Sequence, residues 1–213
     1  MFEGRGLEPS QNQDDRLEAK RRRVLEAARV QFLTHGYADT GIEAIAREAK
    51  VSTATLYALF TSKVELFNAV IEEASGHFAA RISEVTGASA DSLERLNLFC
   101  EAYARFMSDP FVRAVFRLVA AERRRFTPIA RTFYSMGRTR FGGVLMEMLA
   151  GLEAEGRLTC PRKSVVAGQI MGMIEHPTFL VPLVTGGEVE PDRTPEQIAR
   201  DAVETVMARW GRA

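Results

Sequence analysis

Apolar residues recur along this chain at intervals of three and four residues, and they do not alternate one by one. Between residues 16 and 35 the stripe contains Leu17, Val24, Leu25, Ala28 and Phe32. This spacing places apolar side chains on one face of an α-helix, whereas a half-buried strand needs a period of two. The pattern returns throughout the chain, so we expect an all-α fold of about nine helices. The expected helices cover residues 16–35, 42–49, 54–60, 62–85, 91–107, 110–121, 127–155, 163–185 and 195–211.

Composition narrows the class of protein. The chain has 213 residues, 46% of them hydrophobic, which is enough for one large domain or two small ones. It has two cysteines, Cys100 and Cys160, and no apolar run of about 18 residues that could cross a membrane. Residues 1–15 are polar and acidic, with no secretory leader, and we expect them to form a disordered tail. These features predict a soluble protein of the reducing cytoplasm.

Charge is unevenly distributed, although the formal net charge of the chain is zero. Residues 16–63 contain nine Lys or Arg residues and five acids, whereas residues 1–15 contain one Arg and four acids. A local basic segment matters more for attraction to phosphate than the global sum, because salt screens charges beyond about 8–10 Å. The run Arg21–Arg23 is open to two interpretations: a solvated helix face, or an arm that binds DNA without regard to sequence.

Several helix ends have recognisable signals. Ser62 and Glu65 have the spacing of a capping box, as do Thr40 and Glu43. The sequence Thr194-Pro195-Glu196-Gln197 combines a cap with a proline in the first turn. Gly36 is suited to the left-handed position that follows a helix. Pro177 interrupts an apolar helix and is expected to kink it, because proline lacks a backbone N–H.

Two short expected helices, separated by a four-residue turn, occupy residues 42–60 with the sequence IEAIAREA-KVST-ATLYALF. This is the helix-turn-helix arrangement, which presents the start of its second helix to the DNA major groove. A small apolar seam would lock the two helices together, and Ser52 would cap the second helix. Thr53, Thr55, Tyr57 and Lys63 can donate hydrogen bonds to phosphates or base edges. The seam consists of Ile45, Ala46, Ala49, Val51 and Leu56.

The segment GYADTGIEAIAREAKVSTATLYALFTSKVELFNAV, preceded by RRRVLEAARVQFLTH, resembles the N-terminal domain of TetR-family repressors over residues 20–72. The GY, IA, VS, T-LY--F and SK elements all fall at that family's spacing. Further along, FRLVAAERRRF followed by ARTFY resembles the regulatory domain of the AefR-like subgroup. The resemblance implies a homodimeric repressor on a palindromic operator. It also implies a small hydrophobic molecule, bound in the C-terminal domain, that releases the protein from DNA.

The resemblance assigns roles to individual residues. Thr55, Tyr57 and Lys63 match positions that contact the DNA backbone, and Thr53 and Ala54 match the base-reading start of the recognition helix. The resemblance also places Thr40 at the DNA.

This chain departs from the family in the turn. It has Lys50 where the family usually has glycine. A residue with a side chain is therefore expected to adopt positive φ there, at a cost of about 1 kcal/mol or more.

The expected organisation is a tail over residues 1–15, a helix-turn-helix domain over residues 16–62, and a ligand-binding and dimerisation domain over residues 63–213. Aromatic, Met and polar side chains of the last domain are candidates for the ligand site: His77, Tyr103, Phe106, Phe133, Met171 and Glu175. Apolar residues of the last two long helices are candidates for the dimer face: Val166, Ile170, Met173, Val203, Met207 and Trp210.

Other functions fit the sequence less well. A helical metal oxygenase needs Glu-x-x-His pairs on facing helices, and none occurs here. The chain also has no G-x-S-x-G motif and no phosphate-binding glycine loop, so neither an enzyme nor a cofactor is expected. Glu73 and His77 share a helix face, but one such pair is weak support for a metal site. The remaining alternative is a DNA-binding regulator without an inducer, whose C-terminal domain only dimerises or binds a protein.

Overall fold

A computed structural model describes residues 9–73, 76, 91–123, 131, 134–135 and 137–212 of the chain. Every regular element in these residues is a helix, and the isolated antiparallel bridge between Leu158 and Gly211 is the one β-type pairing among them. The expected all-α fold is therefore confirmed. No helix in the described ranges is long and apolar enough to cross a membrane. Backbone contacts divide the chain into two compact units, residues 1–73 and 74–213, so the helix that begins at Lys63 belongs to the first unit as far as Glu73.

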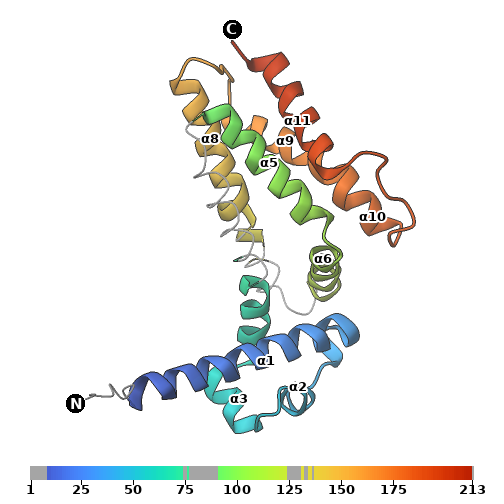
Figure 1. The fold of residues 1–213 in the computed structure, drawn as a ribbon. Helices are drawn as coiled ribbons and strands as arrows, with labels where there is room; N and C mark the ends of the chain where they lie inside the picture. The colour runs from blue at the N-terminus through green and yellow to red at the C-terminus, as the bar shows by residue number, and fades with distance from the viewer. Residues whose placement is uncertain are drawn as a thin grey trace, which may run out of the picture. The chain divides into compact units, whose positions relative to one another are not determined.

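The first unit consists of α1 (Pro9–Asp39), α2 (Ile42–Glu48), α3 (Thr53–Leu59) and the helix that begins at Lys63 (Figure 1). α1 starts earlier than residue 16, so residues 9–15, which were expected in a disordered tail, form its first turns. Residues 1–8 lie outside the described part of the chain.

Three aromatic rings form the centre of the first unit. The ring centroids of Phe32 and Phe67 lie 5.3 Å apart, and those of Tyr37 and Phe67 lie 5.1 Å apart, both in edge-to-face geometry. Aromatic pairs at these distances contribute about 0.5–1.5 kcal/mol each beyond the burial of their surface. Because Phe67 belongs to the helix that begins at Lys63, this cluster fixes that helix against α1.

Gly36 produces the bend that returns Tyr37 to this cluster. Its φ of 82° and ψ of 167° lie in a region that residues with a side chain rarely adopt, which confirms the positive φ expected there. The hydroxyl of Thr40 donates to the Gly36 carbonyl at 2.6 Å, and the Gln31 carbonyl lies 3.0 Å from the same oxygen. The end of α1 is thus held by a side chain that follows it.

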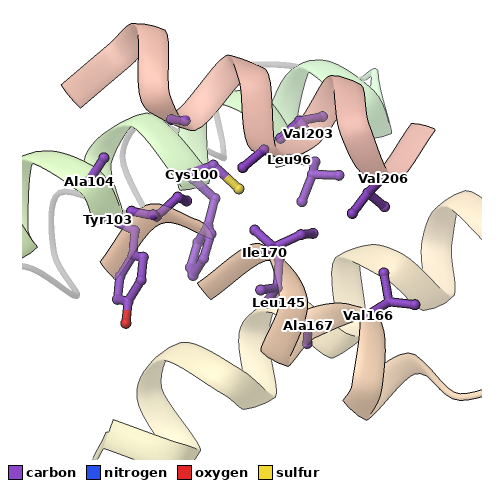
Figure 2. Close-up of a cluster of buried hydrophobic side chains, with 14 of the residues drawn as sticks. Leu96, Cys100, Tyr103, Ala104, Leu145, Val166, Ala167, Ile170, Val203 and Val206 are labelled. Carbon is purple, nitrogen blue, oxygen red and sulfur yellow. The ribbon is translucent and has the colours of Figure 1, made fainter. Parts of the chain in front are cut away.

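The second unit is a helical bundle. It contains α5 (Ser92–Ser108), α6 (Pro110–Glu122), the π-helical segment η1 (Arg138–Gly143), α8 (Val144–Ala154), α9 (Lys163–Glu175), the π-helical segment η2 (His176–Leu180), α10 (Val181–Val184) and α11 (Pro195–Trp210). The long helices α5, α8, α9 and α11 enclose its core, where Leu96, Cys100, Leu145, Ile170 and Val203 are at most 2% exposed (Figure 2). The predicted cap of the last helix is confirmed, since Thr194 and Gln197 form a reciprocal capping box.

The expected irregularity at Pro177 takes the form of the π-helical segment η2, in which the N–H of Val181 bonds the carbonyl of His176 five residues earlier. Pro182 cannot donate a hydrogen bond to Thr178, the carbonyl four residues before it. The guanidinium of Arg113, which is 8% exposed, lies 3.5 Å from that carbonyl and donates to Ser108 O at 2.6 Å. A buried cation from α6 therefore supplies a donor that the proline lacks.

Two substitutions should separate backbone strain from packing. Lys50 has φ 56°, so Lys50→Gly is expected to raise the free energy of unfolding by about 1 kcal/mol. Gly36→Ala should lower the free energy of unfolding by about 1–3 kcal/mol, because residues with a side chain rarely adopt the backbone conformation of Gly36. Packing would not cause this loss, since a Cβ at Gly36 would meet no atom within 4 Å. Urea unfolding of the three proteins tests both. A destabilised Lys50→Gly variant would contradict the strain assigned to the turn.

Candidate functional site

The turn and the second helix of the helix-turn-helix motif are held by local hydrogen bonds. Lys50 adopts the predicted positive φ, and the N–H of Val51 donates to Ala46 O at 3.0 Å. Ser52 caps α3 as expected, because its Oγ accepts from the N–H of Thr55 at 3.1 Å. Leu56 is fully buried and fixes the inner side of α3. α3 therefore has a defined start and a defined rotation about its own axis.

The opposite side of α3 carries the residues that the sequence predicts at DNA. Thr53, Ala54 and Tyr57 are exposed, and the Tyr57 side chain is 50% accessible. Thr55 is half-buried, and its hydroxyl oxygen lies 2.8 Å from Ser52 Oγ, so part of its hydrogen-bonding capacity is used within the protein. The structure thus brings Thr53, Ala54 and Tyr57 onto one surface and turns Thr55 partly away from it.

Lys63 lies in the first turn of the next helix, and its ammonium group has partners within the first unit. Nζ donates to Ala38 O at 3.2 Å and lies 4.5 Å from the centroid of the Tyr37 ring. A cation at the last carbonyls of a helix is favourable, because those carbonyls lack backbone donors. Lys63 therefore secures the end of α1, and its contact with DNA stays a prediction.

The structure corrects the role expected for Thr40. This residue is 3% exposed, and its hydroxyl bonds the carbonyls of α1, so it offers no group to a DNA backbone. It does not cap α2 either, since Gly41 occupies that N-cap and no side chain bonds there. The capping box expected between Thr40 and Glu43 was wrong. The hydroxyl is drawn instead to the backbone of α1, where the bend at Gly36 leaves carbonyl acceptors.

The capping box expected at Ser62 and Glu65 is half formed. Ser62 Oγ accepts from the N–H of Glu65 at 3.1 Å. The Glu65 carboxylate does not bond the Ser62 amide; it accepts from the N–H of Thr61 at 2.7 Å and from the Thr61 hydroxyl. These two bonds lower the pKa of Glu65 below its ordinary value.

Two exposed cations next to the reading surface were not predicted as DNA contacts from the sequence, where Lys50 was considered only for its backbone conformation. Arg47 lies in the last turn of α2, and Lys50 occupies the turn before α3; both side chains are exposed. Their position within the helix-turn-helix motif was the signal that could have identified them, because cations there can approach phosphates on either side of the groove.

In the second unit, two of the predicted ligand residues form a hydrogen bond. The Tyr103 hydroxyl on α5 donates to Oε1 of Glu175, the last residue of α9. Burial raises the pKa of Glu175, and the bond from Tyr103 opposes that rise only in part. Burial, followed by the charge of Glu175, raises the pKa of the Tyr103 phenol as well. The carboxyl is thus a polar group in a mostly apolar environment.

Aromatic rings surround this pair. The Tyr103 centroid lies 6.2 Å from Phe99 in a stacked arrangement and 5.4 Å from Phe141. Phe141 lies 5.3 Å from Phe106, and the latter ring is partly buried. The structure therefore brings Tyr103, Phe106 and Glu175 of the predicted ligand residues into one region. Met171 packs partly buried against the same core, and His77 and Phe133 lie outside the described residues.

The structure also corrects the expected dimer face. Val166, Ile170 and Val203 are at most 2% exposed and point into the core of their own unit (Figure 2), so they offer no surface to a second copy. The apolar stripe that suggested an interface is the stripe that buries α9 and α11. Met207 is partly buried against the core.

An open hollow of about 800 Å³ lies on the outward side of α9 and α11. Its lining includes two of the residues expected at the dimer face, Met173 and Trp210. Small or polar residues line part of it, including Gly168, Gly172, His176, Asp201 and Thr205, and the apolar Ile198 and Val206 line it as well. The hollow therefore contains part of the face that the sequence suggested, whereas the rest of that face lies in the core.

The raised pKa of Glu175 predicts a pH dependence of stability. Between its ordinary value of 4.5 and the higher folded-state value, the folded chain binds more protons at this site than the unfolded chain. The contribution of Glu175 to the free energy of unfolding therefore falls as pH rises through this window. Glu175→Gln removes that contribution, so its stability relative to the parent should rise with pH. Urea unfolding of both proteins from about pH 4 to about pH 7 measures the difference; parallel curves would contradict the assignment.

Two family models match the chain. "Bacterial regulatory proteins, tetR family" matches residues 24–70, and "AefR-like transcriptional repressor, C-terminal domain" matches residues 94–212, which is more than half of the chain. The first match contains the helix-turn-helix motif, and the second contains the Tyr103–Glu175 pair and the hollow on α9 and α11.

Individual relatives agree with these models. The transcriptional activator FasR of Mycolicibacterium smegmatis is 32% identical over 88 residues, which are 41% of this chain and 40% of FasR. A TetR-family transcriptional regulator from Mesorhizobium loti has the same fold, with a TM-score of 0.76, 24% identity, and coverage of 92% of this chain and 99% of that one.

The flavonoid-responsive regulator FrrA has a TM-score of 0.67 and 28% identity, with coverage of 91% of this chain and 98% of that one. The helix-turn-helix geometry and both family models lead to one conclusion. The chain belongs to the TetR family of transcriptional regulators.

Proposed function

We propose that this DNA-binding regulator is a homodimeric repressor that a small hydrophobic molecule releases from a palindromic operator. The observation that carries the proposal is the exposed face of α3. Thr53, Ala54 and Tyr57 lie on this face, while Ser52 caps the helix and the buried Leu56 anchors its other side. TetR regulators are DNA-binding transcription factors rather than enzymes, and the C-terminal match is to a repressor model. FasR, by contrast, is named an activator, so a transcription assay with and without the regulator measures the direction of regulation.

The size of α3 supports a dimer. The helix has seven residues and offers few side chains to a groove, whereas specific protein–DNA interfaces bury about 1,000–2,500 Å² of protein surface. Two copies related by a two-fold axis would read two half-sites one helical turn apart. The hollow on α9 and α11 is the surface we assign to the second copy, since Gly168 and Gly172 leave room there for side chains of a partner.

The proposed ligand response rests on the second unit. A ligand changes DNA affinity only if it binds one conformation of the regulator more tightly than the other. Glu175 and the rings around it supply a polar group within an apolar environment, which is the composition of a small-molecule site. FrrA, which is described as responsive to flavonoids, supports a small aromatic effector for this chain as well. The alternative, a C-terminal unit that only dimerises or binds a protein, assigns no ligand to the Tyr103–Glu175 pair.

The DNA contact of Tyr57 can be tested by fluorescence polarisation on duplexes tiled from the DNA that flanks the gene. Tyr57→Phe keeps the ring and removes the hydroxyl, so we expect specific affinity to fall about three- to tenfold. Tyr134→Phe is the matched control, because the Tyr134 side chain is 70% exposed but lies in the second unit. An equal loss in both variants, or no loss in Tyr57→Phe, would remove Tyr57 from the interface.

The dimer face can be tested at Gly172. A Cβ at this position meets no atom within 4 Å in the protomer, so Gly172→Glu is expected to fold normally. A carboxylate in the hollow would lie against its own copy across the two-fold axis, and the dimer should weaken at least about tenfold. Sedimentation equilibrium measures the assembly, with Val184→Glu as the control at an exposed residue of α10. A Gly172→Glu protein that dimerises as tightly as its parent would place the interface elsewhere.

A further inference from the structure

We propose that Glu175 recognises the effector through a hydrogen-bond donor, and that the effector is an aromatic molecule carrying a hydroxyl or ammonium group. The inference rests on the proposed ligand response and specifies its chemistry. It is carried by three features of the second unit: the unused oxygen of the Glu175 carboxyl, the accessible rings beside it, and the charge balance around it.

The carboxyl of Glu175 has capacity for a further donor. Its Oε1 accepts from the Tyr103 hydroxyl, whereas Oε2 has no hydrogen-bond partner among the described residues. Oε2 is also not among the described oxygens that are completely enclosed and unsatisfied, and the residue as a whole is only half-buried. A molecule that reaches this oxygen with an O–H or N–H would complete the hydrogen bonding of the carboxyl.

Aromatic surface lies next to that oxygen. Phe141 and Phe106 pack against the core, yet both remain partly accessible. Phe141 contacts both Tyr103 and Phe106, at centroid distances of 5.4 and 5.3 Å, so the three rings form a continuous aromatic wall. In Figure 2 the Tyr103 hydroxyl points away from the Leu96 and Cys100 side chains, at the margin of the buried cluster. In our proposal, an aromatic ligand packs on the accessible parts of Phe106 and Phe141 with its substituent facing the carboxyl.

Charge selects among aromatic molecules. No described cation forms an ion pair with Glu175, so among the described residues nothing offsets the repulsion between this carboxyl and an anionic ligand. A purely apolar ligand would exclude solvent from Oε2 without donating a hydrogen bond to it. Removing a polar oxygen from water in this way has a free-energy cost. A phenol or an ammonium avoids both penalties. The bond from Tyr103 shows that a phenol can approach this carboxyl at hydrogen-bonding distance.

A matched series on one ring system tests the inference by calorimetric titration of the full-length protein. The probes are 2-naphthol, 2-naphthylmethylammonium, 2-methoxynaphthalene and 2-naphthoate, which share the ring and differ in donor and charge. We expect 2-naphthol or the ammonium to bind at least about tenfold more tightly than the methyl ether, and the carboxylate to bind most weakly. Whether 2-naphthol or 2-naphthylmethylammonium has the higher affinity shows whether the natural effector is a phenol or an amine.

Variants assign the preference to Glu175. Glu175→Leu removes both acceptor oxygens, so the donor probes and the methyl ether should bind with equal affinity. Glu175→Gln keeps an acceptor but removes the charge, so it should retain preference for naphthol and lose preference for the ammonium. Tyr103→Phe leaves the carboxyl in place and should retain both preferences. Glu147→Leu, at an exposed residue of α8, is the matched control and should bind all probes as the parent does.

Three results would overturn the inference: equal binding of naphthol and its methyl ether by the parent, tightest binding of naphthoate, or a donor preference that survives Glu175→Leu in a folded protein. Circular dichroism of each variant establishes that it folds. Operator binding without probes is measured separately, so a failure of the proposed regulator and a failure of this ligand chemistry give different results.

Discussion

The contact on which the helix-turn-helix unit depends is the aromatic packing between α1 and the helix that begins at Lys63. Phe32, Tyr37 and Phe67 lie within 5.6 Å of one another by ring centroid, and all three side chains are almost completely buried. Tyr37 reaches this cluster because the chain bends at Gly36, and Lys63 covers the outer face of the Tyr37 ring. α2 and α3 are short helices that could not bury enough surface to be stable alone. The aromatic cluster therefore supplies the fixed frame against which they pack.

That frame explains why several polar groups of the motif bind protein atoms. The bend at Gly36 exposes carbonyls at the end of α1, and the nearby donors of Thr40 and Lys63 satisfy them. A reading helix must hold its orientation before DNA arrives, since a mobile helix would have to be ordered on binding at a cost in affinity. In this unit, part of the hydrogen-bonding capacity of the motif is used to hold the helices, and the exposed face of α3 is left for recognition.

Local features were predictable from the sequence, because each depends on neighbouring residues. The helices, the Ser52 cap and the irregularity after Pro177 follow from short-range sterics and hydrogen bonding. Family resemblance added the identity of the reading helix and the positive φ at Lys50. The partners of Thr40 and Glu65 were not predictable, because a hydroxyl or carboxylate near a helix end has several backbone groups within reach. Which group it bonds depends on how the preceding helix ends.

Three of the six residues predicted for the dimer face, Val166, Ile170 and Val203, were mispredicted for a related reason. An apolar stripe on a helix shows that one face is buried, but it does not show whether that face meets the same chain or another one. On α9 the stripe with Val166 and Ile170 packs inward, and the outward side carries Gly168 and Gly172. Glycines in a helix have weak helix propensity and no apolar surface, so they gave no signal of an interface. Only the packing of the whole bundle distinguishes the two sides.

The end of α9 brings the two proposed sites onto adjacent residues. The Glu175 carboxyl bonds Tyr103 on α5, whereas the next residue, His176, lines the outward hollow. His176 also begins η2, and the Thr178 carbonyl of this segment, which Pro182 cannot bond, is approached by Arg113 of α6. An effector that binds Glu175 would therefore act on the residue next to the surface proposed for the second copy. Regulation of a dimer requires a ligand to favour one arrangement over another, and a π-helical segment is a place where a helix can change its hydrogen-bonding pattern.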